Sequence, residues 1–159
     1  MCCSYWSNTL FALNKIKMII AVDFDGTIVE HEYPKIGKEI VFATETLKEL
    51  IKDGHQLILW SVREGELLQE AIDWCHERGV DFWAVNKDYP EEEKGKNNHF
   101  SRKLKADMFI DDRNLGGLPD WGTIYRMVKN HETWESMGYN HPNPSYGEKP
   151  KKKKHWWNR

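Results

Sequence analysis

Two aspartates separated by one residue, Asp23 and Asp25, directly follow an apolar run in the sequence IIAVDFDGT. A second pair, Asp111 and Asp112, ends another apolar run in MFIDD. Like charges at the ends of buried segments repel one another and lose hydration, which opposes folding unless a cation compensates them. Because oxygen ligands without cysteine or histidine favour Mg²⁺, we expect these four carboxylates to surround a magnesium ion. One of the four carboxylates could also have a role other than metal binding.

The segments that must position these acids alternate between strand and helix patterns. Apolar runs of buried-strand length lie at 18–24, 55–61, 80–86 and 105–112. Strands separated by helices of about a dozen residues indicate right-handed βαβ units. We therefore predict an α/β fold with a Rossmann-like, doubly wound parallel sheet covered on both faces. Ligands of such sheets bind at the carboxyl ends of the strands, where one crevice would collect Asp23, Asp25, Ser61, Asp111 and Asp112.

Apolar residues at helical spacing predict helices within 41–54, 64–79 and 118–130. Asp120 is the expected N-cap of the last helix, and Ser61 would also cap the helix that starts near Glu64. The buried face of the first helix is predicted to carry Phe42, Leu47, Leu50 and Ile51. That of the second is predicted to carry Leu67 or Leu68, Ile72 and Cys75.

Four short motifs resemble those of the haloacid dehalogenase (HAD) superfamily, in the same order along the chain. DFDGT is similar to the first motif, and Ser61 at the end of LILWS to the second. Lys103 in SRKLKAD is similar to the third, and Asp111–Asp112 in MFIDDRN to the fourth. The similarity covers residues 18 to about 130. The short segments between the motifs most resemble the small members of the superfamily that have no separate cap domain.

The resemblance implies a phosphatase, a phosphoric monoester hydrolase that depends on Mg²⁺. Asp23 would attack phosphorus to give an aspartyl-phosphate, and Asp25 would act as general acid and base. The backbone carbonyl of Asp25 would also ligate the metal. The implied metal ligands are Asp23, Asp25, Asp111 and Asp112, and the implied substrate- or phosphate-binding residues are Phe24, Thr27, Ser61, Val62 and Lys103.

Several nearby residues admit two interpretations. Spacing to the last strand favours Lys103 over Lys105 as the site lysine. Arg63 would either touch substrate or lie exposed on the surface. His31 is a weak candidate for substrate contact, and Arg113 would pair with a neighbouring acid or with substrate.

An uncapped site is open, and this limits what the sequence says about substrate. The segment 28–40 is predicted to form a hairpin-like flap, and 87–102 a polar surface loop. We expect either a phosphorylated small molecule or the exposed phosphate terminus of a larger substrate, or a site closed by a neighbouring subunit in a homo-oligomer. The alternative function is a phosphate-binding or regulatory module without turnover. A receiver-type phosphoacceptor domain is disfavoured by the order of the acids.

The 159 residues are those of one folded domain with net charge −2, so the whole chain is not a basic nucleic-acid binder. We predict a dispensable extension over 1–17, a catalytic domain over 18–132 and a polar, basic tail over 133–159. Lys151–Lys154 and the tryptophans after them would suit contact with nucleic acid or an anionic membrane. We favour the simpler interpretation, a solvated tail. A cytoplasmic location is predicted, because no apolar run has membrane length and the three cysteines suit free thiols.

Overall fold

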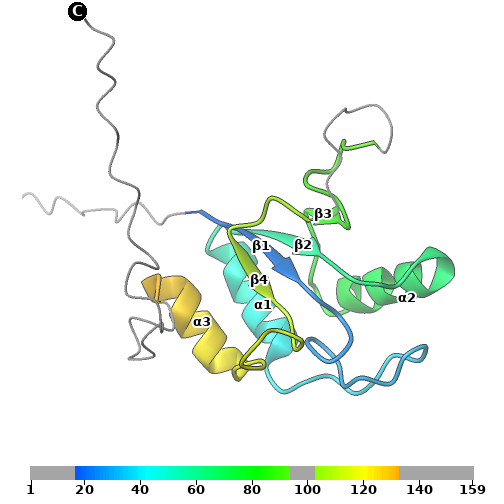
Figure 1. Cartoon of the computed structure of the whole chain (residues 1–159), viewed down its shortest axis with the longest axis horizontal. Coiled ribbons are helices and arrows are strands. Elements are labelled where there is room, and N and C mark those ends of the chain that lie inside the picture. The colour runs from blue at the N-terminus through cyan, green and yellow to red at the C-terminus, as the bar shows by residue number, and fades with distance from the viewer. Residues whose placement is uncertain (1–16, 94–102, 133–159) are drawn as a thin grey trace, which may run out of the picture. The chain divides into compact units, whose positions relative to one another are not determined.

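The structure is a computed structural model, and it describes residues 17–93 and 103–132 (Figure 1). The predicted extension, except Lys17, and the predicted tail lie outside the described residues. Contacts within the chain divide it into two units, residues 1–125 and 126–159, and the boundary falls inside the last helix. The sheet and the candidate site belong to the first unit.

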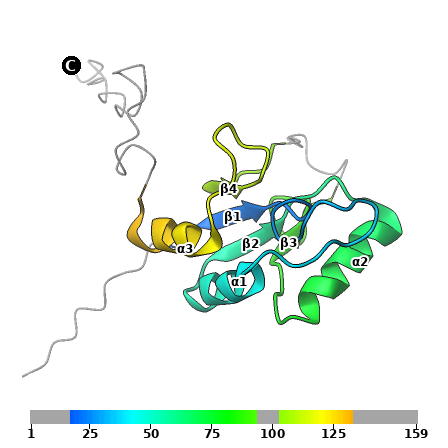
Figure 2. The same ribbon diagram turned by 90° about the horizontal axis from the view of Figure 1, so that it is seen from below.

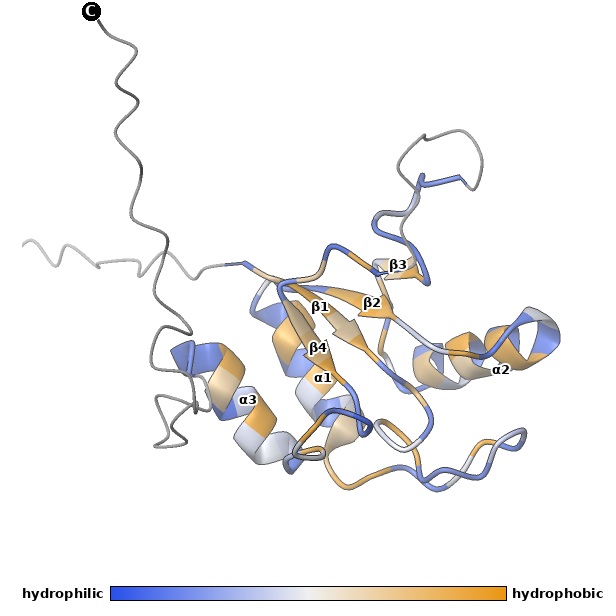
Figure 3. Ribbon diagram, in the orientation of Figure 1, coloured by the Kyte–Doolittle hydropathy of each residue, from blue (hydrophilic) through white to orange (hydrophobic). Residues whose placement is uncertain are grey.

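A four-stranded parallel sheet forms the core of the first unit, in the strand order β3-β2-β1-β4. Its strands are β1 (Ile19–Val22), β2 (Gln56–Leu59), β3 (Ala84–Val85) and β4 (Met108–Ile110). All four lie within the runs predicted as strands. The two central strands are buried on both faces, which explains why their sequences are continuously apolar rather than alternating. Figure 3 shows this concentration of hydrophobic residues on the strands.

Helices α1 (Ala43–Lys52) and α2 (Gly65–His76) connect β1 to β2 and β2 to β3. Both connections step across the sheet in the same direction, so right-handed crossovers place both helices on one face (Figure 2). This face buries Leu47 and Leu50 of α1 and Cys75 of α2, as predicted, together with Ala71. The other predicted residues are only partly buried: Ile51, Leu67, Leu68 and Ile72. Burial raises the pKa of the Cys75 thiol to about 12.

Phe42 was predicted on the buried face of α1, and this prediction is wrong. The residue is the N-cap of the helix, with φ of 67°, and its side chain is 65% exposed. The first turn instead buries Ala43 and Thr44. The hydroxyl and the backbone N–H of Thr44 both donate to the Glu39 carboxylate. The hydrophobic pattern therefore placed the start of the helix too early.

The face of the sheet opposite α1 and α2 carries a hydrophobic cluster that includes a residue from the segment before β4. Ala21, Ile58 and Ala84 pack there against Leu104, and partly buried Trp60, Trp83 and Phe109 surround them. Between β3 and β4, none of the described residues, 86–93 and 103–107, is helical. A parallel α/β sheet is thus confirmed, whereas the helix that a doubly wound sheet would place on this second face is not among the described residues.

The last helix, α3 (Trp121–Asn130), begins as predicted. Asp120 accepts hydrogen bonds from the Thr123 backbone N–H at 3.0 Å and from its hydroxyl at 2.7 Å, and so acts as the N-cap. In the second unit, the structure describes residues 126–132, where the Glu132 N–H closes the helix on the Met127 carbonyl. No helix within the described residues is long and apolar enough to cross a membrane.

Candidate active site and metal centre

Asp23 leaves the end of β1 at the edge of the sheet where all four strands have their carboxyl ends. Its backbone N–H donates to the Ile110 carbonyl of β4 at 3.0 Å, which keeps the two strand ends side by side. The chain then turns tightly, and the Gly26 N–H returns to the Val29 carbonyl at 2.7 Å. This turn brings Thr27 next to Asp112, which follows β4.

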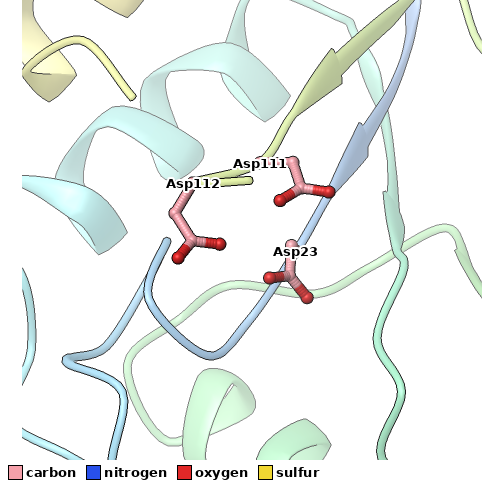
Figure 4. A group of neighbouring side chains, drawn as sticks. All are labelled: Asp23, Asp111 and Asp112. Atoms are coloured by element: carbon pink, nitrogen blue, oxygen red, sulfur yellow. The ribbon is translucent and has the colours of Figure 1, made fainter. Parts of the chain in front are cut away.

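Three carboxylates meet at this edge, those of Asp23, Asp111 and Asp112 (Figure 4). One oxygen from each lies within 4.8 Å of the corresponding oxygens of the other two, and all three residues are partly buried. They come from two neighbouring strands, so the sheet itself sets their separation. Asp25 was predicted to ligate the metal through its backbone carbonyl, and its carboxylate is not part of this group.

Asp112 is held by the turn after β1. Its backbone N–H donates to the Thr27 hydroxyl at 3.0 Å, and its carboxylate lies against Gly26. A Cβ on Gly26 would come within 2.4 Å of Asp112 Oδ2, and the φ of +89° at this glycine also disfavours any side chain. Gly26 therefore leaves space for the Asp112 carboxylate, and Thr27 fixes the backbone of Asp112.

The acidic group has the properties expected of a cation site. Asp112 Oδ1 is buried and has no hydrogen-bond partner, although a buried charged oxygen normally has one. Burial raises the pKa of Asp23 to about 7; a hydrogen bond from the Phe24 backbone opposes this, and the charges of Asp111, Asp112 and Asp25 add to it. Since a divalent cation would neutralise the carboxylates and supply the missing partner, these residues fit Mg²⁺.

Asp25 lies next to this group but has a different environment. Its side chain is 5% exposed, and both carboxylate oxygens are bound by Arg63, with Nε and Nη2 each donating at 2.7 Å. These hydrogen bonds raise the pKa of Arg63 above its ordinary value. Arg63 therefore occupies both oxygens of the carboxylate that was predicted to transfer the proton.

Arg63 is itself completely buried. It therefore neither lies exposed on the surface nor reaches a substrate, the two alternatives predicted from the sequence. Besides binding Asp25, it donates to the carbonyl oxygens of Pro34 at 3.0 Å and Lys35 at 2.9 Å. The predicted hairpin is present, since the Glu30 N–H donates to Lys38 and the Ile40 N–H to Ile28. Arg63 thus ties the tip of the hairpin 28–40 to the turn after β1.

A cavity of about 290 Å³ opens in front of the acids. Asp23, Asp25 and Asp111 form one part of its lining, and Arg113 lies beside them. The remaining lining residues are His31 and Tyr33 from the hairpin, and Trp60, Ser61 and Val62 after β2. The structure therefore brings the predicted residues Ser61 and Val62, and the weak candidate His31, into one cavity with Asp23.

Ser61 is fixed by a residue that the sequence analysis missed. Asn86, directly after β3, accepts a hydrogen bond from the Ser61 N–H and donates one to the Ser61 carbonyl, both at 2.9 Å. The Ser61 hydroxyl accepts from the Arg63 N–H at 3.2 Å, and α2 starts at Gly65, so Ser61 does not cap that helix. The only signal for Asn86 was a polar residue at the end of the third apolar run.

Asp112 and three of the predicted phosphate-binding residues, Phe24, Thr27 and Lys103, lie outside the cavity lining. Phe24 and Thr27 are fully buried: the Phe24 ring packs edge-on against Trp74, and Thr27 positions Asp112. Their side chains therefore have structural roles and do not bind phosphate. Lys103 is exposed, and Lys105 is exposed with Nζ 3.9 Å from the Asp88 carboxylate. Neither lysine lines the cavity.

Fold and site together define an α/β protein with a candidate divalent-cation site at the carboxyl ends of two adjacent parallel strands. The solved structure of a conserved protein coded by a locus from Bacteroides thetaiotaomicron is 65% identical in sequence, with a TM-score of 0.72. The match covers 79% of this chain and 100% of that one. The chain belongs to the same family as that protein. No family model and no curated protein matched the chain.

Proposed function

We propose that the protein is a Mg²⁺-dependent phosphomonoester hydrolase of the HAD type, with Asp23 as nucleophile. The observation that carries this proposal is the group Asp23, Asp111 and Asp112, in which the buried Asp112 Oδ1 lacks a hydrogen-bond partner. The motif resemblance agrees with this group, because the three residues are those in the first and fourth motifs. The open cavity in front of Asp23 gives a phosphate ester access to the nucleophile.

The proposed reaction has two steps. An Asp23 carboxylate oxygen attacks phosphorus and the bond from phosphorus to the ester oxygen breaks, which gives the aspartyl-phosphate. The leaving group departs as an oxyanion and takes a proton from solvent water. Water then attacks this phosphorus, which releases inorganic phosphate and restores Asp23. Asp111 and Asp112 would hold Mg²⁺ together with Asp23. The bound ion supplies positive charge where an anionic nucleophile meets an anionic substrate.

Arg113 is the better placed cation for the phosphoryl oxygens. It lines the cavity beside Asp111, whereas Lys103 does not. The backbone N–H of Arg113 donates to Asp111 Oδ1 at 2.8 Å, which fixes the start of this side chain beside the acids. A guanidinium binds phosphate oxygens through two parallel hydrogen bonds, so we assign the phosphate contact to Arg113.

Asp25 has a structural role in this proposal. Its carboxylate, bound twice by Arg63, would have to give up hydrogen bonds in order to carry a proton to a leaving group. Esters whose alcohol leaves readily as an anion, such as aryl phosphates, need least help from a general acid. We therefore expect aryl phosphates to be hydrolysed faster than alkyl phosphates.

The test is hydrolysis of an aryl phosphate by the full chain with Mg²⁺, with chelator and with the Asp23→Asn variant. We expect turnover that needs Mg²⁺ and is lost in the variant, and a phosphorylated protein that is trapped by acid quench in the wild type alone. The control is Asp120→Asn, which changes an acid at the helix N-cap, outside the cavity lining. Turnover that persists in Asp23→Asn would refute the proposal.

The second candidate is a phosphate-binding or regulatory module on the same fold. It is favoured by the Asp25–Arg63 pair, because Arg63 binds the carboxylate that was expected to act as general acid. This candidate predicts that inorganic phosphate binds in the presence of Mg²⁺ while no phosphate ester is turned over. Calorimetry with inorganic phosphate, carried out beside the hydrolysis assay, separates the two functions.

A further inference from the structure

One wall of the cavity has no part in the phosphoryl chemistry proposed above. It consists of His31, Tyr33, Trp60 and Val62, which line the cavity together with the acids. Tyr33 is 49% exposed and Val62 is 75% exposed, while Trp60 is partly exposed. Large apolar side chains that remain open to solvent inside a concave site indicate a binding surface. We refer to these four residues as the aromatic wall.

The aromatic wall is held in place from behind. The Arg63 guanidinium lies 5.3 Å from the centre of the Tyr33 ring and 5.2 Å from that of Phe24, and its hydrogen bonds hold the two residues after Tyr33. A cation over a ring face stabilises the position of that ring. Tyr33 is therefore positioned before any ligand arrives, which lowers the entropy lost on binding.

Trp60 is anchored on the other side. Its backbone N–H donates to the Val22 carbonyl at 2.8 Å, and its ring packs edge-on against Phe109 with the ring centres 5.0 Å apart. The two aromatic residues thus come from separate segments, the hairpin and the end of β2, and each ring contacts a neighbouring side chain, Arg63 or Phe109. A planar group that enters the cavity would meet a preformed surface.

We propose that the aromatic wall is a leaving-group subsite, and that the substrate is a small phosphomonoester whose alcohol carries a neutral aromatic or heteroaromatic ring. This inference rests on the proposed function, because it takes the phosphate to lie at Asp23. The cavity of about 290 Å³ has room for a ring beside a phosphate. The aromatic wall contains no lysine, arginine, aspartate or glutamate, so it suits an uncharged group.

The experiment compares two non-hydrolysable probes, phenylphosphonate and methylphosphonate, which share the phosphonate group and differ in the ring. Their dissociation constants are measured by calorimetry on the full chain with Mg²⁺. The variants are Tyr33→Ala and Tyr33→Phe, and the control is Tyr89→Ala, a tyrosine outside the cavity lining. Thermal melting of each variant verifies folding, which half-exposed Tyr33 should not affect.

We expect phenylphosphonate to bind about tenfold more tightly than methylphosphonate to the wild type, Tyr33→Phe and Tyr89→Ala, since ring contacts have this magnitude. In Tyr33→Ala the ratio should fall to about threefold or less, while the affinity for methylphosphonate stays unchanged. Two results would overturn the subsite and leave the proposed function intact: equal binding of both probes to the wild type, or an unchanged ratio in Tyr33→Ala. Binding of neither probe would overturn the proposed function and the subsite together.

Discussion

Arg113 and Lys103 carry the same charge, but their positions in the fold give only one of them access to the cavity. Both are exposed basic side chains close to β4 in sequence, but only Arg113 lines the cavity that contains Asp23. Sequence similarity assigned the phosphate contact to the lysine. The geometry instead favours the arginine, which follows directly on Asp112.

The first prediction concerns these two residues. Arg113→Gln should lower kcat/KM for an aryl phosphate about 10- to 100-fold, because it removes a cation from the transferring phosphoryl group. Lys103→Gln, the matched control, should change kcat/KM less than about threefold. Steady-state kinetics at fixed Mg²⁺ makes the comparison. The opposite ranking of the two variants would return the phosphate contact to Lys103.

At the scale of elements, the turn after β1 determines whether Asp112 can reach the site. Gly26 has a φ of +89°, and a Cβ there would collide with the Asp112 carboxylate. Gly117 has a similar φ of +76°, but a Cβ there would meet nothing within 4 Å. The two glycines therefore share a backbone requirement and differ in their surroundings.

We predict that Gly26→Ala weakens Mg²⁺ binding at least tenfold, whereas Gly117→Ala leaves it unchanged. Both variants should lose a comparable stability of about 1–2 kcal/mol from backbone strain. The difference between them reports the displaced Asp112 carboxylate alone. Calorimetric titration with Mg²⁺ measures the affinity, and equal Mg²⁺ affinities in the two variants would contradict the role given to Gly26.

The hairpin 28–40 is the second element that affects the site, and the Asp25–Arg63 pair secures it. Asp25→Asn should lower the free energy of unfolding by on the order of 3 kcal/mol, because it leaves a buried guanidinium without its anion. Hydrogen exchange at the Glu30 and Ile40 amides, which pair across the hairpin, should accelerate. Denaturant unfolding and hydrogen exchange provide the measurements.

A surface ion pair supplies the control for that variant. His76 and Asp81 are 2.6 Å apart but 73% exposed, so Asp81→Asn should change stability little. If Asp25→Asn kept its stability and its hairpin protection but lost turnover, Asp25 would be a proton-transfer group after all. The same variant thus separates the structural role from the catalytic one.

At the scale of the whole molecule, the acidic group couples stability to pH and to metal. Folding raises the pKa of Asp23 from 3.8 to about 7, so between these pH values the folded state binds more protons than the unfolded state. The metal-free protein should therefore lose stability as pH rises through this window. Mg²⁺ should restore the stability at high pH, because it replaces the proton as partner of the carboxylates.

We predict that, in chelator, Asp23→Asn melts at a higher temperature than the wild type at pH 8, and that this difference disappears towards pH 4. Asp120→Asn is the control: its hydrogen bonds with Thr123 lower the pKa of that carboxyl below 3.8, so it should show no such change between pH 4 and 8. Thermal melts across this range give the result. A constant difference between Asp23→Asn and the wild type would contradict the coupling.

Local sequence patterns were sufficient to locate the four strands and three helices of the described residues to within a few positions. The four apolar runs became the four parallel strands, Asp120 became the N-cap of α3, and the acids at the ends of the first and fourth runs came together. These features depend on residues close together in the chain and on the rule that parallel strands end at one edge. The error at Phe42 arose because hydrophobic spacing marks a helix face better than it marks the first residue.

The tertiary structure alone decided which polar residues are buried and with which partners. Arg63 lies 38 residues from Asp25, and its buried guanidinium also needs the carbonyl oxygens at the tip of the hairpin as partners. Asn86 reaches Ser61 across 25 residues, and Thr27 reaches Asp112 across 85. The sequence by itself predicted that Asp23, Asp111 and Asp112 lie close together, because they follow parallel strands that end at one edge of the sheet. The aromatic wall and the pairing of Asp25 were decided by packing between distant segments, since burial of a charge depends on the groups that surround it in space.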